Sequence, residues 1–267
     1  MIIIGEKING TGSRVAQAIV ERDREFIIDL AKSQVAAGVD FLDINAGTSQ
    51  EREAEDLVWL VRTVQDVVNV PLCLDSPNPK PLSSALKEVK QTPMINSISG
   101  ESTRLINVLP LASEHGCPLI ALALDDSGIP KGIEGRLDVI RRVLSQTRAK
   151  GIPDEKVYID PLVLTLGTDW NAGKIAMDTM QTIRSEFPKT HLIVGLSNIS
   201  FGLPARHLIN RTFLSLAMMA GLDSAILDPM DEALRAIILT TELVLGQDRF
   251  CRNYTQSYRS GVIEKKC

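Results

Sequence analysis

Short apolar segments alternate with longer segments of helical periodicity eight times along the chain. Continuous apolar segments of this length are typical of a parallel sheet covered by helices, in which neither face meets water. Eight strand–helix units favour a single closed (β/α)8 barrel over an open doubly wound sheet. The strands are predicted at Ile2 to Ile8, Phe41 to Ala46, Pro71 to Ser76, Met94 to Ile98, Leu119 to Leu124, Val157 to Val163, Leu192 to Ser197 and Ala225 to Asp228.

Carboxylates and amides recur where these apolar segments end, whereas lysine and histidine do not. A parallel barrel gathers the carboxyl ends of its strands at one mouth, so we expect these side chains to converge on one site. A carboxylate accepts two parallel hydrogen bonds from an N–H and NH2 edge, and an amide both donates and accepts. The pattern predicts a site for a flat nitrogen heterocycle, such as a pterin or purine, formed by Asp43, Asp75, Asn96, Asp125, Asp160, Asn198 and Asp228.

Length and composition are consistent with one barrel. The chain has 267 residues, of which 44% are hydrophobic, and a domain of this size buries roughly 75% of its unfolded surface. We predict a barrel over residues 1–247 and a C-terminal tail, residues 248–267, that packs on the barrel or extends beyond it. The net charge of −4, with Lys and Arg spread along the chain, argues against nucleic acid as a partner.

No segment reaches the length of about 18 apolar residues that a membrane span needs, and the apolar start is too short for a signal peptide. We therefore expect a cytoplasmic protein that does not bind a membrane.

Lys7 is the only lysine in a predicted strand, which disfavours Schiff-base chemistry. The segment from Gly10 to Val15 resembles a dinucleotide fingerprint but has a valine in place of the third glycine, so we interpret it as a loop and a helix start.

A bound metal is not expected in this chain. His115 and His207 fall on predicted helices or loops, and His191 lies at the amino end of its strand, so a zinc site is disfavoured. Hard cations accept carboxylates alone, so a magnesium site remains an alternative, with ligands Asp43, Asp75, Asp160 and Asp228.

Six short motifs make the chain resemble a known family. The motifs are Gly5-Glu6-Lys7-Ile8-Asn9, Leu42-Asp43-Ile44-Asn45, Cys73-Leu74-Asp75-Ser76, Ile95-Asn96-Ser97, Ile159-Asp160-Pro161-Leu162 and Gly195-Leu196-Ser197-Asn198. They resemble the pterin-binding methyltransferases that move a methyl group between tetrahydrofolate and a corrinoid protein. These include the methyltetrahydrofolate:corrinoid/iron-sulfur protein methyltransferase and the folate module of cobalamin-dependent methionine synthase. The match spans nearly the whole chain, and it implies a dihydropteroate-synthase-like TIM barrel.

The resemblance implies a role for each residue that matches the family's motifs. Asp75, Asn96 and Asp160 would hold the pyrimidine edge of the pterin, and Gly195 and Ser197 would line the pocket. Asn198 would lie beside N5 as a catalytic residue, and Asp160, through a water, or bulk solvent would supply the proton there. Further candidates for the pocket are Asp43 and Asn45, and Arg206 for the folate tail if it is not simply a solvated surface residue.

The implied substrate is tetrahydrofolate or 5-methyltetrahydrofolate, and the cobalamin would be carried by a corrinoid partner protein. The resemblance also implies a homodimer and no metal bound by this chain. Dihydropteroate synthase is the alternative enzyme, but that family has a lysine where this chain has Asn198, and its Asn-Pro-Asp-Ser-Phe pattern is missing here. A pterin-binding protein without chemistry is a third hypothesis.

Overall fold

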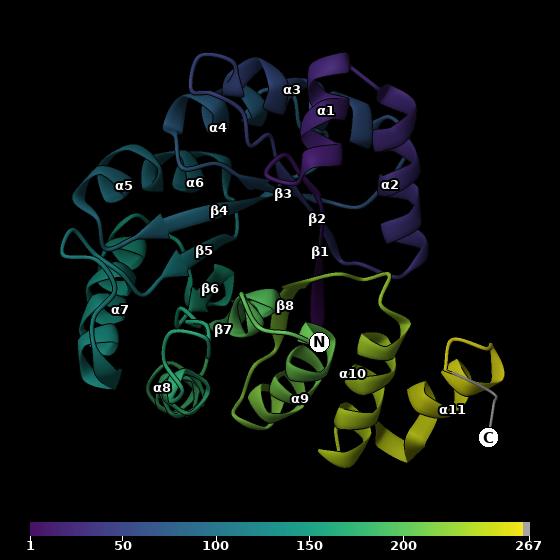
Figure 1. Cartoon of the computed structure of the whole chain (residues 1–267). Coiled ribbons are helices and arrows are strands. Elements are labelled where there is room, and N and C mark those ends of the chain that lie inside the picture. Colours follow the sequence, from purple (N-terminus) through teal and green to yellow (C-terminus); the bar gives the residue numbers. More distant parts are fainter. Residues whose placement is uncertain (264–267) are drawn as a thin grey trace.

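A computed structural model describes residues 1–263 and shows a closed barrel of eight parallel strands (Figure 1). The strands follow one another around the barrel in chain order, and the first pairs with the last, as in Ile4 with Ile226. The predicted fold class is therefore confirmed. The strands are β1 (Ile2–Asn9), β2 (Phe41–Asn45), β3 (Leu72–Asp75), β4 (Met94–Ser99), β5 (Leu119–Leu122), β6 (Val157–Asp160), β7 (His191–Gly195) and β8 (Ser224–Leu227).

Helices surround the barrel, and each strand is followed by at least one of them (Figure 1). Asp231 begins one of these helices, as its position predicts, because its side chain accepts hydrogen bonds from the backbone N–H groups of Ala233 and Leu234. The α-helices are α1 (Ser13–Glu21), α2 (Arg24–Ala36), α3 (Glu53–Gln65), α4 (Pro79–Leu86), α5 (Ser102–Asn107), α6 (Leu109–His115), α7 (Gly132–Ala149), α8 (Ala172–Glu186), α9 (Arg206–Met219), α10 (Glu232–Val244) and α11 (Arg252–Arg259).

Three short 3-10 helices complete the described chain: η1 (Asp154–Lys156), η2 (Leu196–Ser200) and η3 (Arg249–Cys251). The first part of the predicted C-terminal tail forms η3 and α11, and α11 lies beside α10 at the edge of the molecule (Figure 1). Residues 264–267 of that tail lie outside the described residues.

The alternation of side chains along each strand produces two apolar layers. Outward-facing strand residues pack against the helices in a large core that includes Leu42, Leu74 and Ile159. Inward-facing residues fill the barrel with a second, smaller core made of Ile4, Cys73, Met94, Ile120, Tyr158 and Ile193.

Polar residues follow this inner core two positions further along the strands. Because side chains alternate with period two, a residue two positions after an inward-facing apolar residue also points into the barrel. The apolar layer thus forms a floor, and above it at the carboxyl end lies a polar layer that includes Glu6, Asp75, Asn96 and Asp160. On β2, Asp43 follows the partly buried Phe41 by two positions and pairs in register with Cys73, and Asn45 pairs with Asp75.

Several strands end earlier than their apolar sequences predict. β6 stops at Asp160, because the next residue, Pro161, has no N–H to continue the ladder. β5 stops at Leu122, although Ala123 and Leu124 are also apolar. Asp43 lies inside β2 rather than at its end, which Asn45 forms.

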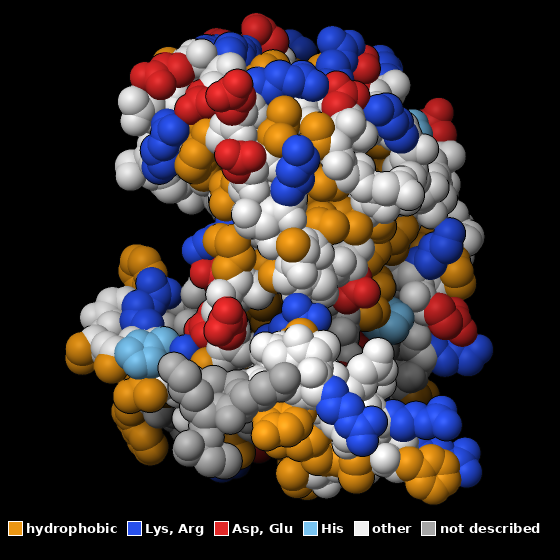
Figure 2. Space-filling model, turned by 90° about the vertical axis from the view of Figure 1, so that its right-hand side faces the viewer, with side chains coloured by type: hydrophobic (Ala, Val, Ile, Leu, Met, Phe, Trp, Pro, Cys, Tyr) orange, Lys and Arg blue, Asp and Glu red, His pale blue; other side chains and the backbone are white. Residues whose placement is uncertain are grey.

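Acidic and basic side chains are interspersed over the upper part of the face shown in Figure 2. This mixture agrees with the absence of charge clustering in the sequence. Within residues 1–263, no helix is both long enough and apolar enough to cross a membrane.

Candidate functional site

A cavity of about 780 Å³ opens at the carboxyl end of the barrel. Its floor and inner wall come from strands β1, β2, β3, β4, β7 and β8, and its outer wall comes from the β1–α1 loop and from α1 and α2. The polar residues that line it are Glu6, Lys7, Asn9, Thr11, Ser13, Arg14, Asp43, Asp75, Asn96, Ser197, Asn198 and Arg206. The barrel therefore brings together six of the seven predicted site residues; these are Asp43, Asp75, Asn96, Gly195, Ser197 and Asn198.

Two carboxylates face each other at the base of this cavity. Asp43 accepts a hydrogen bond from Asn96 Nδ2 at 3.4 Å, and Asp75 accepts one from Asn45 Nδ2 at 2.7 Å. Burial raises the pKa of Asp43 well above its usual range, and the neighbouring Asp75 raises it further. Burial also raises the pKa of Asp75, although the hydrogen bond from Asn45 acts in the opposite direction. Burial thus disfavours the charged form of both carboxyl groups, and hydrogen bonds from the N–H groups of a ligand would counteract this effect.

The turn after β7 places Asn198 at the cavity wall. A Cβ atom at position 195 would lie 3.0 Å from Asn198 Nδ2, so a residue larger than glycine would displace this amide by a few tenths of an ångström. Arg206 fixes the same turn, because its Nη2 donates to the carbonyl of Ser197 at 2.7 Å and its Nε donates to Ser200 Oγ at 3.1 Å. Arg206 therefore both lines the cavity and holds the backbone next to Asn198.

Asp160 is buried at the carboxyl end of β6 but is not among the residues that line the cavity. Its Oδ1 accepts a hydrogen bond from the backbone N–H of Leu162 at 2.8 Å, and Leu162 has a φ of +63°. This bond supports a left-handed backbone position that a leucine rarely adopts. Burial raises the pKa of Asp160 to about 6, although Leu162 and Arg136 act in the opposite direction.

The substitution Asp160→Asn is expected to raise the free energy of unfolding at pH 8 by roughly 1 to 3 kcal/mol. A folded-state pKa of about 6, above the ordinary 3.8, means that the wild-type loses stability as the pH rises between these values. The asparagine keeps the acceptor for Leu162 and has no charge to bury. The gain in the free energy of unfolding should therefore be present above pH 6 and vanish near pH 4. Urea unfolding at pH 8 and at pH 4 measures it.

Asp248 provides the matched control for this prediction. The hydrogen bond from the backbone N–H of Tyr254 lowers its pKa, and those from Asn253 and Arg252 act in the same direction, whereas burial acts in the opposite one. Its contribution to stability is present above its ordinary pKa and is lost as the pH falls. Asp248→Asn should therefore not stabilise the protein at pH 8. An equal gain in both variants would show that the effect does not come from the buried charge of Asp160.

Two other strand-end carboxylates have different partners. Asp125 lies three residues beyond β5, outside the cavity, where it accepts hydrogen bonds from Ser127 and pairs with Arg142. Asp228 follows β8 and pairs with Lys7 Nζ at 2.6 Å. Within residues 1–263, no three His, Cys, Asp or Glu side chains are grouped closely enough to hold a metal ion.

Some cavity residues are missing from the predicted set. Glu6 is one of them, although it lies two positions after the inward-facing Ile4, and the alternation that places Asp75 after Cys73 also predicts it. Arg14 and Phe26 come from α1 and α2, and the guanidinium of Arg14 lies 4.1 Å from the centre of the Phe26 ring. No periodic signal in the sequence marks these helices as a wall of the cavity.

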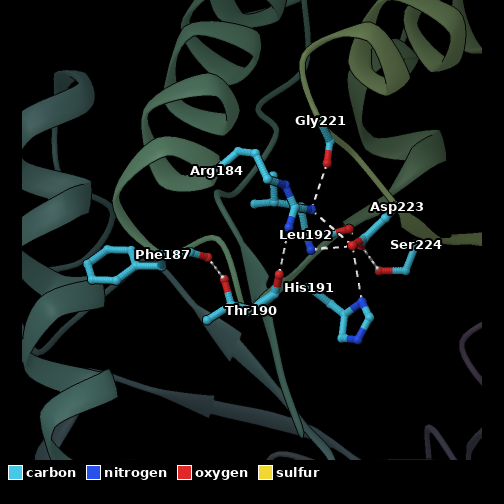
Figure 3. A network of polar contacts seen from close by, with 8 residues as sticks. All are labelled: Arg184, Phe187, Thr190, His191, Leu192, Gly221, Asp223 and Ser224. Carbon is cyan, nitrogen blue, oxygen red and sulfur yellow. Dashed lines mark hydrogen bonds and ion pairs between the residues drawn. The ribbon is translucent and has the colours of Figure 1, made fainter. Parts of the chain in front are cut away.

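The amino end of the barrel has a polar network of its own (Figure 3). Asp223 accepts hydrogen bonds from the backbone N–H of Leu192 at 2.9 Å and from Arg184 Nη2 at 2.9 Å, and it contacts His191 Nδ1 at 3.1 Å. The ring of His191 also stacks on Tyr158, with centroids 4.5 Å apart. His191 thus lies at the opposite end from the cavity, as its sequence position predicts, and stabilises the pairing of β7 with β8.

The cavity combines carboxylate and amide acceptors with Ile226 and Gly195 in its lining, above the apolar floor of the barrel. Its one lysine, Lys7, is held by Asp228, so no lysine in the cavity is without a carboxylate partner in residues 1–263. Such a site suits a planar heterocycle that presents several N–H donors, whereas Schiff-base chemistry has no suitable amine.

Comparison with known proteins agrees with this geometry. The family model described as "Pterin binding enzyme" matches residues 5–228. The methylcorrinoid:tetrahydrofolate methyltransferase of Eubacterium limosum is 38% identical over 265 residues, which are 98% of this chain and 98% of that protein. The methionine synthase of Mycobacterium leprae is 30% identical over 239 residues, which are 85% of this chain and 20% of that protein.

Solved structures share the fold at lower identity. A dihydropteroate synthase from Stenotrophomonas maltophilia has a TM-score of 0.70 and 16% identity, covering 94% of each chain. A dihydropteroate synthase from Coxiella burnetii in complex with pteroic acid has a TM-score of 0.69 and 15% identity, covering 91% of this chain and 94% of that one. At this level of identity, the likeness shows the barrel architecture alone.

Proposed function

The chain belongs to the pterin-binding enzyme family, and from this premise we propose that it transfers a methyl group between N5 of tetrahydrofolate and the cobalt of a corrinoid. The relative of Eubacterium limosum, similar over 98% of both chains, is named for a transfer of this kind. The observation that carries the proposal is the joint presence of a carboxylate pair and Asn198 in one cavity. The pair recognises the pterin, and the amide faces its reacting edge.

Recognition of the pterin rests on the polar layer of the barrel. In our proposal, Asp75, Asn96 and Asp160 hold the pyrimidine edge, Asp43 supports them, and the inner apolar core supports the ring. An N–H and NH2 edge donates two parallel hydrogen bonds to a carboxylate, which strengthens binding beyond that of neutral partners. Asp160 reaches this edge only if the bound ligand extends toward β6, since the residue does not line the cavity itself.

Activation at N5 is the chemical problem of this reaction. The methyl group of 5-methyltetrahydrofolate leaves an amine, so N5 must gain a proton or a strong hydrogen bond during transfer. Cobalt(I) of the corrinoid is the nucleophile, and this chain binds and orients the folate and stabilises the changing charge at N5. Asn198 suits that role, because its amide accepts from a protonated N5 and donates to a neutral one.

The corrinoid is a substrate carried by a partner protein, and we propose that this partner docks over the mouth of the barrel. We also propose a homodimer and a cytoplasmic location. An apolar groove of about 370 Å³ between α8 and α9 supports the homodimer, since Trp170 is 87% exposed at its rim and Leu208 and Leu216 are also exposed.

A visible spectrum tests the proposed reaction directly. When free cob(I)alamin is mixed with 5-methyltetrahydrofolate and the protein, we expect its spectrum to convert to that of methylcobalamin, and the reverse reaction should run from methylcobalamin and tetrahydrofolate. A mixture without protein is the control for spontaneous transfer. No conversion with free or protein-bound corrinoid, together with condensation of a dihydropterin pyrophosphate with 4-aminobenzoate, would contradict the proposal and favour a dihydropteroate synthase. Tight folate binding without either reaction would favour a pterin-binding protein without chemistry.

A further inference from the structure

A second cavity of about 270 Å³ adjoins the main one. It lies between the end of β8, the turn η2 and the first residues of α9 and α10. Glu6, Ser197 and Arg206 line both cavities, while His207 and Asn210 line only the second, which we call the side cavity. Glu6 therefore lies on the wall that the two cavities share.

The carboxyl group of Glu6 lies among charged groups, but it accepts no hydrogen bond from residues 1–263. Asp228 at the end of β8, Lys7 on β1, Arg206 on α9 and Asp43 on β2 are the charged groups around it. No hydrogen bond from residues 1–263 contributes to the shift of its pKa. Burial raises the pKa of Glu6, and Asp228 raises it further, against the effects of Lys7 and Arg206.

We propose that Glu6 carries the proton that is exchanged at N5 of the bound folate, and that the side cavity connects Glu6 with solvent. This inference rests on the proposed methyl transfer. Glu6 lines the same cavity as Asn198, and Ser197, the neighbour of Asn198, lines both cavities together with Glu6. Asp160, the other candidate for this proton, does not line the main cavity.

The exchange balances in both directions. In transfer from 5-methyltetrahydrofolate, the carboxylic acid of Glu6 gives its proton to N5, and the bond between N5 and the methyl carbon breaks with its electron pair remaining on N5. The electron pair of cobalt(I) forms the new bond to the methyl group. The carboxylate of Glu6 then takes a proton from solvent. In the reverse direction, the carboxylate accepts the proton that N5 loses.

The side cavity explains how this proton is replaced while the reaction proceeds. In the proposed complex, a corrinoid protein docked over the mouth separates the main cavity from solvent, whereas the side cavity lies beside it, between the first residues of α9 and α10. The Oδ1 atom of Asn210 is buried on its wall and has no hydrogen-bond partner within residues 1–263, so a solvent molecule in the side cavity would satisfy it.

The substitution Glu6→Gln tests the proposal, because it keeps the size of the side chain and removes the titrating proton. We expect single-turnover transfer from 5-methyltetrahydrofolate to cob(I)alamin to slow by roughly 10²-fold, with folate affinity changed by less than about threefold. In the wild-type, this rate should fall as the pH rises through the pKa of Glu6, and the reverse rate should rise. Both pH dependences should be lost in Glu6→Gln and retained in His207→Gln, which removes the imidazole of the side cavity.

Unchanged rate and pH profile in Glu6→Gln would overturn the proposal, as would a loss of the pH dependence in Asp160→Asn or His207→Gln instead. Calorimetry of 5-methyltetrahydrofolate binding in two buffers of different ionisation enthalpy separates this proposal from the proposed function. It counts the protons taken up on binding, even if no transfer occurs. An altered proton count in Glu6→Gln supports a proton exchanged with the folate, and an identical count in both proteins contradicts it.

Discussion

Replacing Asn198 with alanine is expected to slow methyl transfer by roughly 10²-fold to 10³-fold, with a much smaller loss of folate affinity. The amide lies on the turn that follows β7, where Arg206 donates to the carbonyl of the preceding residue, Ser197. In the proposed mechanism, the amide changes from acceptor to donor in its hydrogen bond with N5 as N5 changes charge, so its contribution differs between the ground state and the transition state. Only such a difference affects the rate of the chemical step.

Two measurements separate this role from simple binding. Single-turnover rates with saturating 5-methyltetrahydrofolate report the chemical step, and calorimetry reports folate affinity. Asn198→Asp, which accepts but does not donate when ionised, is the matched variant and should retain more activity in transfer from a protonated N5 than Asn198→Ala. If Asn198→Ala lost affinity and rate by the same factor, Asn198 would contribute only to uniform binding and the role assigned to it at N5 would be wrong.

The architecture of the barrel could be predicted from the sequence because the same pattern, an apolar segment followed by a helical one, is repeated along the chain. Eight successive strand–helix units are compatible with few chain topologies. The strict alternation of side chains along a strand then places Asp75 above Cys73 and Asn96 above Met94. The same alternation predicts Glu6 above Ile4. This residue was missed because β1 continues to Asn9, so that Glu6 lies inside the strand rather than at its end.

The position of Asp125 and the outer wall of the cavity could not be predicted from the sequence, for physical reasons. Ala123 and Leu124 extend the apolar run of β5 but not its ladder, so Asp125 lies beyond the polar layer and pairs with Arg142 instead. The outer wall of the cavity comes from α1 and α2, and the contact of Arg14 with Phe26 depends on how these helices pack. Strand periodicity carries no information about such packing.

Replacing Asp75 with alanine is expected to weaken folate binding by about 2 to 4 kcal/mol, which corresponds to roughly 30-fold to 10³-fold in Kd. In the proposed complex, the carboxylate of Asp75 accepts hydrogen bonds from the pyrimidine edge, and alanine leaves these donors without a partner. Asn45 Nδ2 also loses its acceptor, which now lies 2.7 Å away. Since Asp75 raises the pKa of Asp43, the remaining carboxyl group should ionise at lower pH in the variant.

Calorimetry with tetrahydrofolate measures this loss, and Asp125→Ala is the matched control, because Asp125 is an aspartate of the β5–α7 loop outside the cavity. The control should bind folate like the wild-type. Asp75→Asn separates charge from shape: an affinity as low as that of Asp75→Ala shows that the charge of the acceptor dominates, whereas a nearly normal affinity shows that a neutral oxygen suffices. Unchanged affinity in Asp75→Ala would remove Asp75 from the pterin site. Because the pyrimidine edge does not change its bonding during methyl transfer, the rate at saturating folate should fall far less than in Asn198→Ala.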